Sequence, residues 1–513
     1  MRELNNYQKQ GISIAGDTGN LFMLVSALVL MSAVLFALLM IFVDFENLPF
    51  QITRVYLIPW VLAAGLVIIA PSIYLMYRNE FSFTHPLVFA TFTYYFPGVF
   101  IGGLLLASGI VEPYYTTFIQ DERYNLPLTM AYITLGYAGL SIGCLMPLGQ
   151  YLGKKLGSRL PVWNWKPERV LLPGILLFGI GIVTTVAAFS QGIIGNQEST
   201  DTSSYYGLLQ ISTYLLLEAT FILWLCIFKL KNLNITHYAI MFILIITTLA
   251  RAAFQGNRGS LPAAVYVVAI AFIFSGRVVK TRHWVTTGSL IAIALVVGMI
   301  YGTTFRNLMT ADRQLGADRY SEMIGNTVLQ ISGQDLTTTL EISFLTLAER
   351  VESVSSVAVV VSTYEQLLPY EESYGLENNI IKESSTFFIP RVIWPNKPTP
   401  SDYSKYSDLY FNFSGSSFAI TPIGDLLRNF GPFGIPIGML LIGLIIRIAY
   451  VSLRETQEFS FWKSTLYFMI LVTISYEGFF ATIIPFLVKM SILSLLGIMF
   501  VGLFARDPQP ANI

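Results

Sequence analysis

The sequence predicts an all-α polytopic membrane protein with about twelve transmembrane helices and one large, partly helical loop outside the membrane. The first observation is composition, since 54% of the 513 residues are hydrophobic and only 12% are charged. The mean hydropathy of +0.61 is far above that of an average soluble domain. The second is that apolar runs of roughly 17 to 25 residues, long enough to cross about 30 Å of hydrocarbon, recur along the chain. The lipid bilayer is therefore the first expected partner.

Twelve apolar runs are long enough to be spans. They cover residues 21–43, 55–77, 86–108, 128–148, 170–190, 207–228, 237–253, 259–275, 285–302, 432–452, 462–480 and 483–505. The first run is too long for a signal peptide and lacks its small-residue cleavage site, so we expect it to remain as an anchor. Cys144 and Cys226 fall inside predicted spans, which argues against a disulfide framework or a thiol-rich metal site.

The positions of lysine and arginine orient these spans. If the N-terminus is cytoplasmic, most basic residues of the short loops lie inside, and the short outside loops hold only Arg54, Arg123 and Arg258. This imbalance fits the positive-inside rule, and the even number of spans returns the C-terminus to the cytoplasm. The net charge is zero, which argues neither for nor against nucleic acid, and we expect no nucleic-acid partner.

One polar segment interrupts the spans and divides the chain into three parts. We expect a membrane domain at 1–302, an extracytoplasmic loop region at 303–429 and a second membrane part at 430–513. Within the loop region, apolar residues alternate at steps of four and three, which indicates one helical stripe. They are Leu340, Phe344, Leu347, Val351, Val354, Ala358 and Val361. A single helix of about 25 residues is expected there, with Arg350 at the edge of its stripe and Glu349 pointing away.

The stretch "FFIPRVIWPNKPTP", residues 387–400, combines cations with four prolines. Proline fixes its own φ and pushes the preceding residue toward extended backbone, so the segment cannot be a helix and holds Arg391 and Lys397 at a nearly preset distance. Such a pair suits a phosphate or diphosphate. The alternative is a structural loop in which the two cations pair with Glu383 or Asp402.

A second cationic stretch, "LARAAFQGNRGS", lies where the seventh predicted span leaves the membrane. Arg251 and Arg258 are seven residues apart, which is nearly the same face of a helix. An arginine so near hydrocarbon is costly without a partner and is a functional candidate. Near the outer ends of the last two spans, Glu477 and Lys489 could neutralise one another, and Glu218 is expected as a buried hydrogen-bonding group.

These stretches together resemble a known family. "IPRVIWPNKP" looks like the [I/V]-P-R-x-x-W-P-x-K-P signature of bacterial oligosaccharide repeat-unit polymerases, the Wzy-type O-antigen and capsule polymerases. The block "TPIGDLLRNFGPFGIPIGMLLIG", residues 421–443, is similar to the family's G-[D/E]-x-x-x-N-F-G-x-x-G block. "NRG" at 257–259 resembles its [S/N]-R-G, and Arg350 resembles the arginine of its loop helix. Arg428 departs from the expected aromatic or aliphatic character.

The resemblance implies a glycosyltransferase that acts outside the bacterial cytoplasmic membrane in lipopolysaccharide or capsule synthesis. Its donor would be a glycan linked through a diphosphate to undecaprenol, and its acceptor one lipid-linked repeat unit. A flippase and a chain-length regulator would be possible partners. Cations would stabilise the departing diphosphate, and Trp394 would contact sugar. The cation candidates are Arg251, Arg258, Arg350, Arg391 and Lys397.

A general base is less clearly indicated. His85, His237 and His283 fall on the predicted cytoplasmic side, which leaves carboxylates. Asp425 matches the acidic position of the family block, with Glu349 and Asp335 behind it. For Asp425, a cap or a partner of Arg428 is an equally open interpretation. No cluster with metal-ligand spacing is visible, so neither a metal nor another cofactor is expected.

Three other functions fit parts of the sequence. A lipid-linked oligosaccharide flippase would have similar spans but short loops. A transferase that uses polyprenyl-phosphate sugars needs an acidic motif in the first outer loop, where Asp44 and Glu46 stand. A ligase of the O-antigen type would share the donor and differ only in its acceptor. The motifs favour the polymerase.

Overall fold

The computed structural model describes residues 54–163, 165–194, 205–309, 317–333, 335–389, 391, 393–413, 418, 420–455 and 459–505. Within these ranges the chain forms helices and no β-strand, which confirms the all-α class. The first predicted span, 21–43, and the N-terminal acids Asp44 and Glu46 lie outside the described residues.

Nine helical segments of the described chain are long and apolar enough to cross a membrane, which makes this a membrane protein. Five come before α11: η1 with α3 (Val55–Leu57, Ile58–Tyr77), α4 with η2 and α5 (Pro86–Ala90, Thr91–Ile101, Gly102–Ala107), α6 (Glu122–Leu145), α8 (Pro167–Ser190), and α9 with α10 (Tyr206–Ser212, Tyr214–Lys229). The others are α11 (Ile235–Gln255), α13 (Thr281–Met309), α19 with η4 (Thr421–Tyr450, Val451–Glu455) and α21 (Phe480–Ala505). The predicted count of twelve is not confirmed.

Two predicted spans form helices that are too short to cross a membrane. The helix α12 (Ser260–Phe274) has 15 residues, and α20 (Phe461–Thr473) has 13. At 1.5 Å per residue they are roughly 22 and 20 Å long, against about 30 Å of hydrocarbon. The turn before α12 and the turn after α20 face the side that carries the loop region, because both helices neighbour full spans in the chain.

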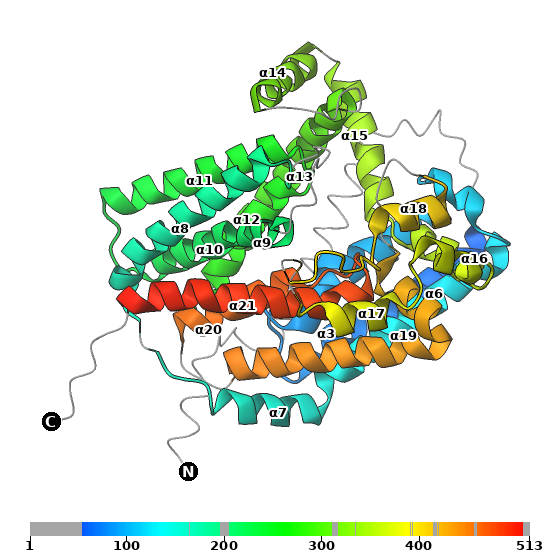
Figure 1. Cartoon of the computed structure of the whole chain (residues 1–513), viewed down its shortest axis with the longest axis horizontal. Helices are drawn as coiled ribbons and strands as arrows, with labels where there is room; N and C mark the ends of the chain where they lie inside the picture. The colour runs from blue at the N-terminus through cyan, green and yellow to red at the C-terminus, as the bar shows by residue number, and fades with distance from the viewer. Residues whose placement is uncertain are drawn as a thin grey trace.

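Two hydrophobic cores flank α21, which runs across the middle of the molecule (Figure 1). One core joins α3, α6, α19 and part of the loop region, and the other joins α8, α10, α12 and α20. The helix α7 (Pro147–Gly157) lies beside α19 and η4. Cys144 and Cys226 are buried free thiols in α6 and α10.

Close packing of α6 on α19 anchors the start of α19. A Cβ on Gly143 would lie 2.1 Å from Leu440 O, and one on Gly443 would lie 2.3 Å from Leu140 O. Small residues allow this backbone approach, as in many membrane helix pairs. Gly431 has φ 68° and ψ −171°, so α19 bends there into a loop-side segment before Gly431 and a span after it. Glycine adopts this conformation without strain.

The loop region contains five helices (Figure 1), and η3 (Tyr114–Phe118), which comes from the loop between α5 and α6, packs on α16. The five helices are α14 (Ala317–Gly333), α15 (Leu336–Val351), α16 (Val354–Tyr374), α17 (Asn379–Thr386) and α18 (Tyr403–Phe411). The predicted boundary at 302 falls within α13, and the boundary at 429 falls beside the bend at Gly431. The proline-rich segment between α17 and α18 is not helical in its described residues, as predicted.

The prediction of one helix of about 25 residues in the loop region was wrong. The apolar stripe is divided between α15 and α16, which meet at a corner formed by Glu352 and Ser353. The Glu352 carboxylate accepts hydrogen bonds from Val354 N and Ser355 N at 2.8 Å or less, so it caps a new helix start. Ser353 N donates to Gly98 O at 3.2 Å. The corner is thus docked on the span formed by α4, η2 and α5. Capping divides the apolar stripe there, and the stripe still packs inward on both sides of the corner.

Candidate functional site

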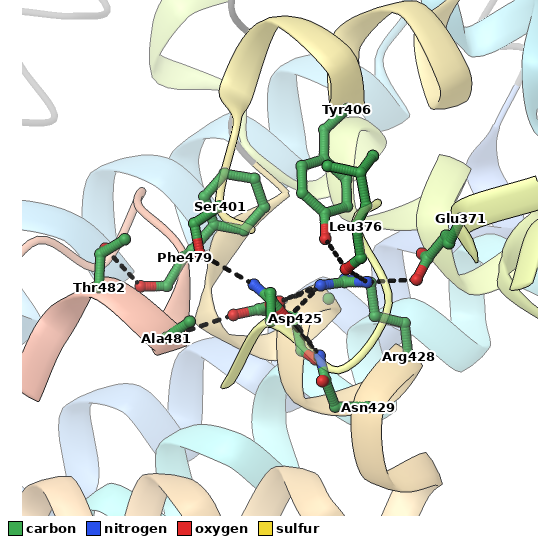
Figure 2. Close-up of polar contacts among 12 residues, drawn as sticks. Glu371, Leu376, Ser401, Tyr406, Asp425, Arg428, Asn429, Phe479, Ala481 and Thr482 are labelled. Atoms are coloured by element: carbon green, nitrogen blue, oxygen red, sulfur yellow. Dashed lines mark hydrogen bonds and ion pairs between the residues drawn. The ribbon is translucent and has the colours of Figure 1, made fainter. Parts of the chain in front are cut away.

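A buried polar network joins the start of α19 to the loop region (Figure 2). Asp425 Oδ1 accepts from Arg428 Nη2 at 2.9 Å, and Asp425 Oδ2 accepts from Ala481 N at 2.9 Å. Arg428 also donates to Glu371 and Asn379, and its Cζ lies 4.5 Å from the centre of the Tyr406 ring. Asp425 and Glu371 are fully buried.

This network gives Arg428 a clear structural role. Its guanidinium neutralises two buried carboxylates from α16 and α19, and both oxygens of Asp425 already accept hydrogen bonds. Burial raises the pKa of Glu371, while Arg428 opposes that rise. The sequence left two roles open for Asp425, a catalytic base or a partner of Arg428. In the structure Asp425 is the partner of Arg428. The pair ties α16, α17 and α19 together beneath the proline-rich segment.

Two of the predicted cations, Arg258 and Arg350, are brought together with a third arginine. Arg258 interacts electrostatically with Arg306, Arg350 and Glu349, and Arg306 interacts with Arg350. We call these four residues the arginine group. They come from the α11–α12 turn, the end of α13 and the end of α15, which are far apart in the sequence. Among the described residues, the side chains of these arginines form no direct ion pair with an acid.

The turn that carries Arg258 is shaped by glycine and by α13. Gly256 ends α11 with φ 54°, and a Cβ there would lie 2.1 Å from the Phe305 ring. A Cβ on Gly302 would lie 2.7 Å from Arg258 Cγ, so the arginine stem crosses α13 where α13 has no side chain. Arg258 can therefore pack against α13 because residues 256 and 302 are both glycines.

The electrostatics of the arginine group favour an anion. Burial and the neighbouring Arg306 and Arg350 lower the pKa of Arg258 to about 10, which still leaves it charged near neutral pH. The buried Nε groups of Arg258 and Arg306 have no hydrogen-bond partner among the described residues. Partial desolvation raises the pKa of Glu349, and Arg258 opposes the rise. Glu349 and Arg350 are exposed at the end of α15. Three cations and one acid leave two net positive charges.

The other predicted cations form a second group around α17 and α21. Lys397 interacts electrostatically with Lys489, Glu383 and Arg391, and Glu383 interacts with all three cations. We call Arg391, Lys397, Lys489 and Glu383 the lysine group. Burial and Lys489 lower the pKa of Lys397, while burial raises the pKa of Glu383. This group also carries two net positive charges.

Three further features complete the lysine group. Trp394 lies between Arg391 and Lys397 in the chain and is 38% exposed, with no ring contact among the described residues. Lys397 Nζ lies 3.4 Å from Ile389 O, which fixes the lysine to its own loop. If the loop is only structural, Arg391 or Lys397 should pair with Glu383. Glu383 does lie near both cations, but among the described residues it forms no direct ion pair with either. Asp402 instead caps α18 by accepting from Ser404 N.

Arg251 belongs to neither group. It interacts with Tyr214 at the start of α10, and its buried Nε has no partner among the described residues. The Tyr214 ring lies 5.6 Å from that of Phe486 on α21. Arg251 therefore lies beside the start of α10, and its described interactions link it to neither set of cations.

Two members of the groups were not predicted as ligands. Arg306 was counted as part of the loop region, and its place four residues beyond the end of a predicted span was the available signal. The sequence suggested only that Glu477 could neutralise Lys489. Among the described residues the two form no direct ion pair, and α17 packs beside α21 and brings Glu383 and Lys397 to Lys489. Glu218 is buried and accepts from Ser494 Oγ at 3.1 Å, which confirms that expectation. Within the described residues, no three His, Cys, Asp or Glu side chains gather as a metal site.

Comparison with known proteins gives one match. The sequence profile of a family described as a domain of unknown function, DUF8712, matches residues 177–496, which is more than half of the chain and includes both groups. No curated protein matches the sequence. No solved structure matches the fold.

Proposed function

We propose that this chain, which belongs to the DUF8712 family, is a membrane glycosyltransferase that polymerises lipid-linked oligosaccharide repeat units. The donor is a glycan joined by a diphosphate to undecaprenol, and the acceptor is a single lipid-linked repeat. An acceptor hydroxyl attacks the donor's anomeric carbon, the bond from that carbon to the diphosphate oxygen breaks, and undecaprenyl diphosphate leaves. The hydroxyl proton passes to a base.

The observation that carries the proposal is the meeting of Arg258 and Arg350 with Arg306. These residues come together from three separate segments, and their charges exceed that of the nearby acid. A diphosphate diester carries two negative charges and gains a third as the sugar departs. Fixed cations that are already in place stabilise this developing charge, and one such donor contributes roughly 3 kcal/mol to lowering a barrier.

We assign the general base to Glu349. It lies beside Arg258, is exposed, and forms no direct hydrogen bond or ion pair with its side chain among the described residues. A carboxylate with a raised pKa is a stronger base than an ordinary one. Asp425 is assigned a positioning role, because both of its oxygens are occupied by Arg428 and Ala481.

The proposed location is the outer side of a bacterial cytoplasmic membrane, with both termini in the cytoplasm. The imbalance of Lys and Arg between short loops supports it. On that orientation both charge groups and the loop region face the outside. Undecaprenyl diphosphate released there is delivered to the leaflet in which both substrates reside.

The first test is reconstitution. The purified full chain is placed in liposomes with lipid-linked repeat units extracted from a host strain that lacks this gene, and products are sized by mass spectrometry. We expect dimers and longer chains with the natural chain and none with Arg350→Gln. The matched control is Arg123→Gln, an exposed arginine on the same side of the membrane. Elongation by Arg350→Gln at the natural rate would overturn the assignment.

A second test separates a polymerase from a flippase. Deletion of a polymerase leaves single repeats on the cell surface, because the units still cross the membrane. Deletion of a flippase leaves no repeats there. We expect single repeats, and an empty surface would contradict the polymerase.

A further inference from the structure

A carboxyl group lies inside the membrane domain without a charged partner. Glu218 stands at the middle of the span Gly207–Lys229 and is fully buried. Its Oε1 accepts a hydrogen bond from Ser494 Oγ on α21 at 3.1 Å. Its Oε2 is buried and has no hydrogen-bond partner among the described residues. The proposed reaction makes no use of this side chain.

The carboxyl group of Glu218 packs on bare backbone of α21. A Cβ on Gly497 would lie 2.6 Å from Glu218 Oε2 and 2.9 Å from Glu218 Cδ. Gly497 follows Ser494 by three residues, so both lie on the same face of α21. Because one of the two is glycine, α10 and α21 can enclose a carboxyl group between them, as small residues allow at other contacts between membrane helices.

The helices packed on α10 bring no charge to Glu218. Within the described chain Glu218 forms no ion pair. Lys229, at the end of α10, is roughly 16 Å away along the helix. The charged or titratable residues of the neighbouring helices lie at helix starts or interact with other groups. They are Glu168 and Arg169 of α8, His237 and Arg251 of α11, Tyr266 of α12, Lys463 and Tyr467 of α20, and Lys489 of α21.

We infer that Glu218 is a proton-binding site whose neutral carboxyl group joins α10 to α21. An ionised carboxylate without a partner is so costly in an apolar interior that the group takes up a proton instead. The proton belongs on Oε2, because Oε1 already accepts from Ser494 Oγ and Oε2 is an acceptor without a donor. This inference does not rest on the proposed function.

Tyr214 marks the way by which the proton is exchanged. It precedes Glu218 by four residues, so the two side chains lie one above the other on the same face of α10. The Tyr214 side chain is half-buried, and its ring lies 5.6 Å from that of Phe486 on α21. Tyr214 also interacts with Arg251, which is near the end of α11 that leads to the loop region. The proton therefore exchanges with the side of the membrane that carries the loop region.

Loss of the proton would place an unpaired negative charge between two packed helices. Water or a cation would have to reach Oε2, and α21 would have to move away from α10 to admit it. The same helix carries Ala481, whose N–H donates to Asp425 Oδ2 at 2.9 Å. A displacement of α21 would therefore also weaken the hydrogen bonding of the buried Asp425–Arg428 pair.

Infrared spectroscopy of the purified full chain in lipid tests the proton site. A protonated carboxyl group has a C=O stretching band that is separate from the bands of carboxylates. At about pH 8.5 exposed acids are ionised, and so is most of Glu352, whose pKa is about 7. We expect a protonated-carboxyl band in the natural chain that is lost in Glu218→Gln and shifted in Ser494→Ala. The matched control is Glu352→Gln, another buried acid, which should keep the band.

Two spectroscopic outcomes would overturn the inference. Identical spectra of the natural chain and Glu218→Gln would show that Glu218 is ionised. Loss of the band on addition of sodium chloride at constant pH would show that a sodium ion replaces the proton, so the site would be one for a metal cation. Neither outcome would affect the proposed function, which is measured by elongation.

Thermal unfolding tests the link to helix packing. As the pH is raised until the band disappears, the unfolding temperature of the natural chain should fall further than that of Glu218→Gln, which stays neutral and can still accept from Ser494. Parallel profiles would refute a role of the proton in joining α10 to α21. Gly497→Ala should also shift the band, because its methyl group meets the carboxyl group, whereas Gly179→Ala, where a Cβ has nothing within 4 Å, should not. An unshifted band in Gly497→Ala would contradict the packing of Glu218 on α21.

Discussion

Glu352 and Gly102 are in backbone contact where the loop region meets the span formed by α4, η2 and α5. A Cβ on Gly102 would lie 2.7 Å from Glu352 Cα, and one on Gly98 would lie 2.9 Å from Ser353 Oγ. Arg350 stands two residues before this corner. The α15–α16 corner is therefore the point that fixes the end of α15, and with it Glu349 and Arg350, against the membrane domain.

Gly102→Ala should displace this corner. The added methyl group meets backbone, which cannot rotate away, so we expect a loss of about 1 to 3 kcal/mol in the free energy of unfolding. Thermal unfolding in detergent measures the loss, and undecaprenyl diphosphate binding reports on Arg350. Gly179→Ala is the matched control, because a Cβ there has nothing within 4 Å. A Gly102→Ala chain as stable as Gly179→Ala would refute the contact.

Glu352 should make stability depend on pH. Burial raises its pKa from 4.5 to about 7, against the opposing hydrogen bonds from Ser355 and Val354. An acid with a higher pKa in the folded chain binds its proton more tightly when folded. Its contribution is therefore present below about pH 4.5 and is lost as the pH rises through 7. The loss is at most about 3 kcal/mol, at 1.36 kcal/mol per pH unit.

The variant Glu352→Gln tests this dependence. Its amide oxygen can still accept from Val354 N and Ser355 N, so the corner is kept while the titration is removed. We expect thermal unfolding of the natural chain to shift downward between about pH 5 and pH 8, and that of the variant to shift less. Identical pH profiles would show that Glu352 does not titrate in this range.

Much of the fold follows from one-dimensional patterns. Hydrophobic length predicted the described long spans, and four prolines predicted the extended segment that carries Arg391 and Lys397. The α15–α16 corner was missed because the apolar period continues through Glu352, and periodicity reports which face is buried without showing where the backbone turns. The prediction of full-length spans at α12 and α20 was wrong, because hydrophobic composition does not show where a helix ends inside an apolar run.

The sequence predicted only some residues of the candidate site. Residue type and family likeness selected Arg258 and Arg350, but their meeting with Arg306 depends on α13 reaching beyond its apolar part to the end of α15. The sequence suggested that Glu477 could neutralise Lys489, because both lie near span ends. The contact of α17 with α21, which no local pattern encodes, gives it Lys397 and Glu383 instead.

The Asp425–Arg428 pair should behave as a structural element. Asp425→Asn leaves Arg428 less neutralised in a buried site, and breaking such a pair typically costs about 3 to 5 kcal/mol. We expect a large drop in thermal stability together with loss of elongation. A catalytic Asp425 would give the opposite pattern, with activity lost and stability kept. Asp408→Asn, which alters the more exposed bond from Tyr374 at 3.1 Å, is the matched control.

Glu349→Gln should abolish elongation and leave the binding of undecaprenyl diphosphate unchanged. The natural chain should elongate faster as the pH rises through the pKa of Glu349, because the base must be deprotonated, and desolvation raises that pKa above the ordinary value of 4.5. The rise in rate should accordingly occur at a higher pH than it would with an ordinary glutamate as the base. Glu341→Gln, an exposed acid on the same helix, should keep the natural profile. An unchanged acid limb in Glu349→Gln, with elongation retained, would assign the base to another group, whereas loss of a bound lipid would show that Glu349 organises the arginines instead of accepting the proton.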